Sequence, residues 1–115
     1  MNADVERTLA RYRDKAEAHA PLTTDHVRKA NRLFKAMHQL AKELRSTEEG
    51  RAALLTMLDH PLPGVRMNAA AECLPFAPDA AVPVIEAIEQ LGVFESLSAK
   101  YTLIGYRNGT LNMDW

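Results

Sequence analysis

The sequence contains one cysteine, no long apolar run and few aromatic residues, and each shortage excludes a class of protein. Cys73 cannot form an internal disulfide and has no second cysteine to share a metal, so we expect a small buried side chain there. No apolar stretch approaches the roughly 20 residues that a membrane-spanning helix needs. Residues 1–7 lack the apolar core of a secretory signal. We therefore expect a cytoplasmic protein that does not enter a membrane.

Strand patterns are also lacking, because no segment alternates apolar and polar residues and β-branched residues are sparse. We therefore expect an all-α fold of about six helices, forming a single domain over residues 1–115. A helical hairpin cannot bury its apolar face alone, so we expect antiparallel hairpins stacked as a short α-solenoid. The expected parts are two N-terminal helices in 1–45, further helices in 46–109 and a tail in 110–115.

The first two expected helices span about 4–19 and 24–45. Each has an apolar residue at every third or fourth position, which predicts one buried stripe along the helix. Thr23 or Thr24 can cap the second helix. The two stripes comprise Val5, Leu9, Tyr12 and Ala16, and then Val27, Ala30, Phe34, Met37, Ala41 and Leu44.

Ser46 and Glu49 have the spacing of a capping box, in which each side chain bonds to the backbone of the other, and they predict the start of a third helix. Two prolines and a glycine in residues 59–64 end this helix near Leu58. The last three helices are expected at about 63–74, 79–91 and 94–107. The positions expected to face the core in these four helices are Ala52, Leu55 and Leu58; Val65, Ala69, Ala70 and Cys73; Val82, Ile85, Ile88 and Leu91; and Leu97, Tyr101 and Ile104.

Residues 54–91 resemble a HEAT-type α-helical repeat. The residues that carry this resemblance are Leu54-Leu55, Leu58-Asp59, Pro61, Val65-Arg66, Ala69-Ala70, Leu74 and Pro83. The resemblance implies that the Val and Ala positions pack between hairpins. It also implies a structural role for Arg66, which would bond to Asp59 or to carbonyl groups of the turn.

Most of the chain is similar to a small bacterial family of unknown function. The motifs that carry this similarity are Asn31-Arg32, Leu58-Asp59-His60-Pro61, Leu74-Pro75-Phe76-Ala77-Pro78 and Ser98-Ala99-Lys100-Tyr101-Thr102-Leu103. The similarity implies HEAT-like helices over residues 46–109 and brings no established activity.

Motifs for catalysis or for metal binding are absent. His19, His26, His38 and His60 do not occur in a His-Glu-x-x-His pattern, and we expect surface histidines at helix ends. No nucleophile motif or glycine-rich phosphate loop is present. We therefore expect a protein that is not an enzyme and that uses no metal and no cofactor.

Charge is unevenly distributed along the chain. Residues 1–45 carry ten Lys or Arg and six Asp or Glu, which gives +4, whereas residues 46–115 carry four and nine, which gives −5. On the second expected helix, one face carries Arg28, Lys29, Arg32 and Lys35. This face can hold phosphates or an acidic protein. Acidic residues of the last three helices, Glu86 and Glu89 among them, can bind a basic partner. Alternatively, the basic residues and the acidic residues are both ordinary solvent-exposed helix faces without a partner.

Trp115 is the remaining candidate, because an aromatic residue in the tail either docks on the core or anchors an interface. Strong helical architecture without catalytic motifs favours a protein-interaction module. A bacterial immunity protein that neutralises a basic toxin is the sharper hypothesis, because an acidic face can occupy the toxin's substrate groove. A homodimer is a further hypothesis. The alternative function is nucleic-acid binding by the basic helix. The pI of about 6.4 and the missing aromatic ladder argue against nucleic-acid binding.

Overall fold

Six α-helices form the protein in a computed structural model, which describes residues 2–22 and 24–115. Short 3-10 turns, Thr24–His26 and Thr56–Asp59, precede the second helix and follow the third. The helices are α1 (Ala3–His19), α2 (Val27–Arg45), α3 (Glu48–Leu55), α4 (Pro63–Cys73), α5 (Pro78–Gln90) and α6 (Ser96–Arg107). The described residues contain no strand, so the predicted all-α fold of six helices is confirmed.

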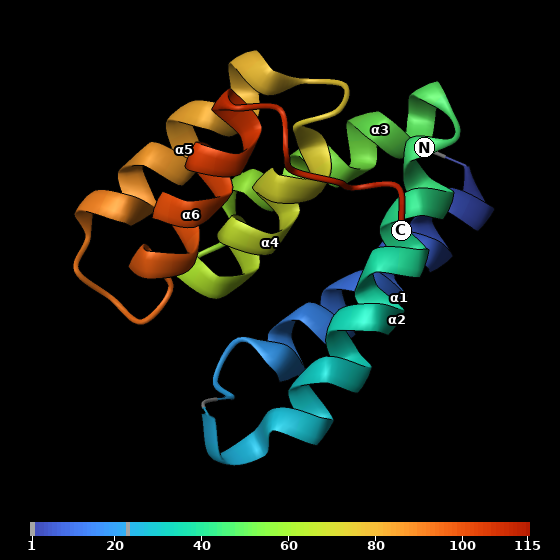
Figure 1. The fold of residues 1–115 in the computed structure, drawn as a ribbon. Coiled ribbons are helices and arrows are strands. Elements are labelled where there is room, and N and C mark those ends of the chain that lie inside the picture. Colours follow the sequence, from blue (N-terminus) through green and yellow to red (C-terminus); the bar gives the residue numbers. More distant parts are fainter. Residues whose placement is uncertain (1, 23) are drawn as a thin grey trace.

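Neighbouring helices in the chain pack against each other, as Figure 1 shows. Helices α1 and α2 lie side by side, and α4, α5 and α6 pack in succession. The α1–α2 pair extends beyond the other helices at the end that holds the connection between α1 and α2. After α6 the chain returns to α2. No helix within residues 2–22 and 24–115 combines the length and the apolar character needed to cross a membrane.

The helix starts differ in detail from the predicted caps. Thr47, in extended conformation, caps α3 by accepting a hydrogen bond from Gly50 N at 3.0 Å. The predicted capping box at Ser46 is wrong, because Ser46 keeps helical backbone angles and its hydroxyl donates to Glu43 O at the end of α2. Glu49 instead accepts hydrogen bonds from Asn2, which itself caps α1. Of the two predicted caps of the second helix, Thr23 lies outside the described residues, and Thr24 is not at the N-cap position of α2, which is occupied by His26.

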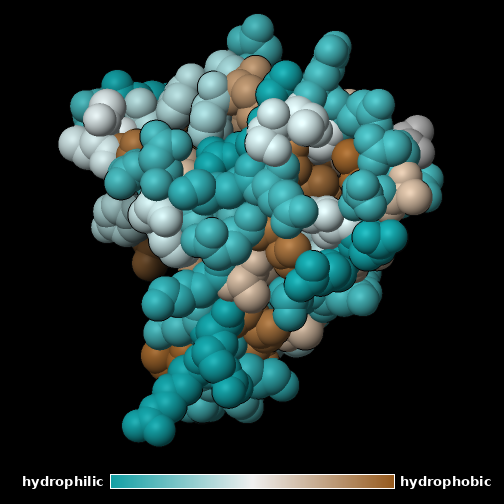
Figure 2. Space-filling view, turned by 90° about the vertical axis from the view of Figure 1, so that its right-hand side faces the viewer, coloured by the Kyte–Doolittle hydropathy of each residue, from teal (hydrophilic) through white to brown (hydrophobic). Residues whose placement is uncertain are grey.

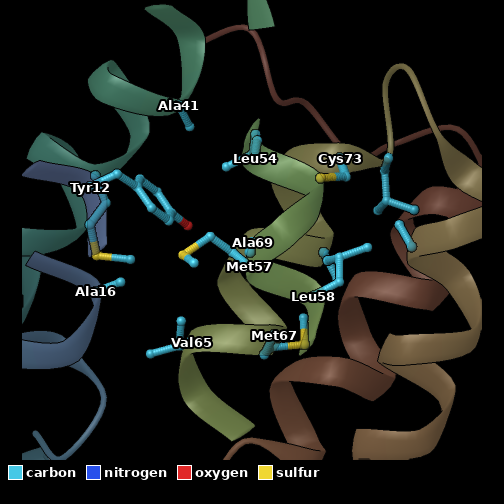
Figure 3. Close-up of a cluster of buried hydrophobic side chains, with 14 of the residues drawn as sticks. Tyr12, Ala16, Ala41, Leu54, Met57, Leu58, Val65, Met67, Ala69 and Cys73 are labelled. Carbon is cyan, nitrogen blue, oxygen red and sulfur yellow. The ribbon is translucent and has the colours of Figure 1, made fainter. Parts of the chain in front are cut away.

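The core runs between all six helices, and Figure 3 shows its centre. The predicted stripe of α1 is confirmed, since Leu9, Tyr12 and Ala16 are buried. The Tyr12 ring points from α1 into the cluster. The small residues of α4 are also buried, which lets neighbouring helices approach closely. The confirmed core positions of α4 and α5 are Val65, Ala69, Ala70, Cys73, Ile85 and Ile88.

Four predicted core stripes are partly wrong, those of α2, α3, α5 and α6. In α2, Val27 and Phe34 are 54% and 40% exposed, because this half of the helix extends beyond α4 and α5. In α3, Ala53 and Leu54 are fully buried while Ala52 is exposed. The buried face of α3 comprises Gly50, Ala53 and Leu54, one position away from the predicted face.

Helix α6 shows the largest difference. Its predicted inward residues Leu97, Tyr101 and Ile104 are 62%, 61% and 46% exposed, whereas Ala99 and Leu103 are buried. The main helical neighbour of α6 is α5, and the small Ala99 lets the two helices lie close together. The wider apolar face therefore points to solvent. Leu91, at the end of α5, was also predicted inward and is 51% exposed.

Candidate functional site

Two buried polar residues face each other between α2 and α4. His38 lies in the middle of α2 and is 2% exposed, and Glu72 lies near the end of α4 and is 5% exposed. His38 Nδ1 is 2.9 Å from Glu72 Oε2 and 3.0 Å from Oε1. Among the ion pairs of the described residues, this is the only one with both side chains buried. The low dielectric of the core strengthens a hydrogen bond in this position.

Burial controls the protonation of this pair. It raises the pKa of Glu72 from 4.5 to about 8, although the positive charges of Arg45 and Lys42 oppose the rise. Burial also lowers the pKa of His38 from 6.5, and the same two cations lower it further. At neutral pH the pair therefore holds one proton. When Glu72 holds this proton it donates to His38 Nδ1, and His38 Nε2 then carries the ring hydrogen.

The C-terminal segment covers His38. The Trp115 ring stacks on the His38 ring with centroids 3.8 Å apart and an interplanar angle of 16°, and it also stacks on Phe34 at 5.7 Å. Two cations of α2 hold the segment by its backbone: Arg45 Nη2 donates to Met113 O at 2.8 Å, and Lys42 Nζ donates to Asp114 O at 3.3 Å. Of the two options left open for Trp115, the structure shows the side chain docked on the protein, with 42% still exposed.

A cavity of about 180 Å³ lies beside the pair. Helices α1, α2, α4 and α6 and the C-terminal segment all contribute to its walls. Two of its lining residues, Tyr12 and His38, each have a buried polar atom, Oη and Nε2 respectively, that has no hydrogen-bond partner among the described residues. Burial and the nearby Glu72 raise the pKa of Tyr12, so its hydroxyl stays protonated. The lining residues are Tyr12, Phe34, Met37, His38, Met67, Asn68, Ala71, Glu72, Ser98, Thr102, Leu111, Asn112, Met113 and Trp115.

The sequence interpretation missed this cavity. His38 is neither at a helix end nor on the surface, so that prediction is wrong for His38. A signal was present, because His38 is four residues after Phe34 and three before Ala41, which places it on the apolar stripe. Glu72 is three residues after the buried Ala69, which places it on the buried face of α4 in the same way. No group of three or more His, Cys, Asp or Glu residues in the described part of the chain could hold a metal ion.

The predicted basic residues Arg28, Lys29, Arg32 and Lys35 are all exposed on the first half of α2. Arg28, Arg32 and Lys35 line one surface hollow together with Asn31. Figure 2 views the molecule from the side of α1 and α2, and this side is mostly hydrophilic with scattered apolar areas. Three of the four predicted basic residues therefore lie on one face of α2, and that face contains a shallow hollow.

The predicted acidic residues lie elsewhere, on α5. Glu86 Oε2 accepts a hydrogen bond from Arg107 Nη2 of α6 at 3.1 Å, and Glu89 is half-buried. Neither residue lines the cavity beside His38. The structure thus does not bring the acidic candidates together with Trp115.

The turn before α4 is closed by its own side chains. Arg66 Nη1 donates to His60 O at 3.0 Å and to Pro61 O at 3.1 Å. His60 accepts from Leu62 N, and its Nε2 is 2.8 Å from Glu17 Oε2 of α1. Asp59, the other predicted turn residue, is exposed and makes no side-chain hydrogen bond within the described residues. Of the two predicted partners of Arg66, the structure therefore shows carbonyl groups of the turn and not Asp59.

Six exposed apolar side chains lie on α6 and in the connection before it. Leu97, Tyr101 and Ile104 are four and three residues apart, which places them on one side of the helix. Phe94, 67% exposed, lies one turn earlier. We call this set, with the exposed Leu91 and Val93, the α6 face. Its members are Leu91, Val93, Phe94, Leu97, Tyr101 and Ile104.

Comparisons with known proteins give a family and a solved neighbour. Residues 12–105 match the family described as Domain of unknown function (DUF2019). The crystal structure of the protein RPA1889 from Rhodopseudomonas palustris CGA009 is similar, with a TM-score of 0.84 and 28% sequence identity over 94% of this chain and 92% of that chain. No curated protein matches the chain significantly. The matches agree with the expected family of unknown function.

Proposed function

The chain belongs to the DUF2019 family, and we propose that it is a non-enzymatic protein-interaction module that binds a protein partner through the α6 face. The observation that carries this proposal is the exposure of six large apolar side chains on α6 and the connection before it. Single exposed apolar residues are common on proteins, but a contiguous set marks an interaction surface.

The spacing of the α6 face suits a protein partner. Leu97, Tyr101 and Ile104 follow the pattern of anchors that a helix inserts into an apolar groove. Tyr101 combines a large apolar ring with a polar hydroxyl, and this residue type is enriched at interface hot spots. Lys100 Nζ lies 5.9 Å from the centroid of the Tyr101 ring, so a charge sits at the edge of the face. An apolar centre with a charged edge is the usual composition of an interface.

The charge around the face indicates a basic partner. Helices α5 and α6 with their connection, residues 78–107, contain four acidic residues, Asp79, Glu86, Glu89 and Glu95, against Lys100 and Arg107. The partner that fits therefore has an apolar groove with a basic rim. Neutralisation of a basic bacterial toxin, as an immunity protein, is the sharper form of this proposal, and the acidic excess supports it.

The proposal is tested by co-purification of the tagged full chain from its native lysate, with partners identified by mass spectrometry. The wild type is compared with a Leu97→Ser/Tyr101→Ser double variant. We expect the wild type to retain a partner in near-stoichiometric amount and the double variant to lose it. Both side chains are more than half exposed, so the substitutions change the free energy of unfolding by roughly 0.5 kcal/mol or less each.

Val27→Ser provides the matched control, because Val27 is an apolar residue with 54% exposure that lies on α2, outside the α6 face. It should retain the partner as the wild type does. Loss of the partner from the Val27→Ser variant, or equal retention by the double variant, would contradict the proposal. Recovery of the chain with a second copy of itself, in place of another protein, would replace the proposal with a homodimer.

The HEAT-like relationship of residues 46–109 is also part of the proposal. It is supported by the turn at 59–64, whose carbonyl groups Arg66 holds, and by the small buried residues Val65, Ala69 and Ala70. In this interpretation the chain is a short stack of hairpins and the α6 face is the uncovered end of the stack. A repeat stack without a polar capping helix leaves such an end available for a partner.

Nucleic-acid binding is the second candidate function, because Arg28, Arg32 and Lys35 line a common hollow on α2. Fluorescence anisotropy with a labelled DNA duplex tests it. This candidate predicts affinity that falls steeply as salt rises and is lost in the Arg28→Ala/Arg32→Ala/Lys35→Ala variant. Absence of binding at 50 mM salt would exclude it.

A further inference from the structure

We propose that residues 112–115 form a lid that opens while the six helices stay folded, and that its opening gives small molecules access to the cavity beside His38. This inference does not depend on the α6 face, whose residues do not line the cavity.

The lid is anchored to the fold only at its start. Leu111 N donates to Gly105 O at 3.1 Å, and the Leu111 side chain packs against the core. Within the described part of the chain, residues 112–115 take part in no hydrogen bond between backbone groups. Asp114 N donates instead to the side chain of Asn112, which belongs to the lid itself. The lid therefore separates from the helices without breaking any helical hydrogen bond.

Side chains of α2 hold the backbone of the closed lid. Arg45 Nη2 donates to Met113 O at 2.8 Å, and Lys42 Nζ donates to Asp114 O at 3.3 Å. Asp114 itself is exposed. Segments with few buried contacts open at a lower free energy than the whole fold. The lid has these properties, because it is attached by side chains of a single helix and by the stacking of one ring.

Trp115 is the part of the lid that closes the cavity. Its ring lies on the ring of His38 with centroids 3.8 Å apart, and His38 lines the cavity together with Met37. With the lid closed, both of these α2 residues are 2% exposed. Asn112 and Met113 line the cavity as well. Because the lid supplies part of the wall, its release opens the cavity on that side.

Thiol labelling of the full chain tests the lid. Met37→Cys places a thiol in the wall of the cavity, whereas the native Cys73 is 0% exposed and does not line the cavity. Cys73 therefore measures opening of the helices in the same molecule. An aromatic disulfide reagent is added, and peptide mass spectrometry follows each thiol. The rate at each position is divided by its rate in denaturant, which removes differences in intrinsic reactivity.

We expect the thiol at position 37 to react faster than Cys73, because lid opening exposes the first and only opening of the helices exposes the second. Equal normalised rates would overturn the proposal, since both thiols would then be exposed by the same opening of the helices.

Trp115→Ala in the Met37→Cys background identifies the lid. The loss of stacking on two rings should raise the rate at position 37 by about tenfold and leave Cys73 nearly unchanged. Leu62→Ala is the matched control, because Leu62 has the same 42% exposure as Trp115 and lies outside the lid and the cavity. It should change neither rate. An equal rise at both thiols in the Trp115→Ala variant, or an unchanged rate at position 37, would contradict the proposal.

Discussion

The buried pair of His38 and Glu72 predicts a specific pH dependence of stability. In the unfolded chain, Glu72 and His38 titrate near their ordinary pKa values of 4.5 and 6.5, so the two groups together hold one proton between these values. Because burial lowers the pKa of His38 and raises that of Glu72, the folded pair also holds one proton at pH 6.5, and it keeps this proton up to about pH 8.

Above pH 6.5 the two states differ by one proton. The unfolded chain has lost its proton while the folded pair retains it until about pH 8, so rising pH favours the unfolded chain. Each pH unit at a difference of one proton changes the free energy by about 1.4 kcal/mol. Over the interval from 6.5 to 8, the pair's contribution to stability falls by about 2 kcal/mol. The result is the same whether the shared proton resides on Glu72 or on His38.

The Glu72→Gln variant isolates this effect. A glutamine keeps a donor toward His38 Nδ1 but cannot titrate, so the decrease between pH 6.5 and 8 should disappear. Urea unfolding followed by circular dichroism at half-unit pH steps measures the difference between variant and wild type. Glu86→Gln, on an exposed carboxylate, should retain the wild-type slope. Parallel curves for wild type and Glu72→Gln across this interval would refute the assignment of a raised pKa to Glu72.

Two further predictions concern close packing and the single thiol. Gly50→Ala should destabilise the protein by about 1–3 kcal/mol, because the added Cβ would collide with the backbone carbonyl of Leu44. Gly105→Ala is its control, because the new Cβ would meet only ordinary contacts with Leu111 and Thr110, and it should be neutral or stabilising by up to about 1 kcal/mol in urea unfolding. Burial raises the pKa of Cys73 to about 12, so the folded protein should react with an aromatic disulfide reagent at pH 8 far more slowly than the protein in denaturant. Equal reaction rates would show that Cys73 is accessible.

Helix positions could be predicted from the sequence because their boundaries are set locally. Proline in the first turn of α4 and the Asn108-Gly109 stop after α6 act through the backbone of a few neighbouring residues. Gly109, for example, has a φ of 77°, which favours glycine. The buried stripe of α1 was equally predictable, because three helices, α2, α3 and α4, pack against that helix.

Burial on α6 and on the first half of α2 could not be predicted, because it depends on which elements lie opposite. The apolar spacing of Leu97, Tyr101 and Ile104 fits a buried stripe, yet no described helix covers it. The cavity could not be predicted for the same reason, because its walls come from several elements. Tyr12, His38 and Glu72 come from three helices, and Trp115 reaches them only through the path of the C-terminal segment. The spacing of residues along one helix does not show which residues of other helices lie next to it.

The measurement that tests the central claim most directly is hydroxyl-radical footprinting of the chain with and without its co-purified partner. Phe94, Leu97 and Tyr101 are more than 60% exposed and should be oxidised readily in the free chain. The proposal predicts that the partner protects these three side chains and leaves Val27 of α2 unprotected. Protection of Val27 with unchanged oxidation of Phe94, Leu97 and Tyr101 would contradict it and would move the interface to α2.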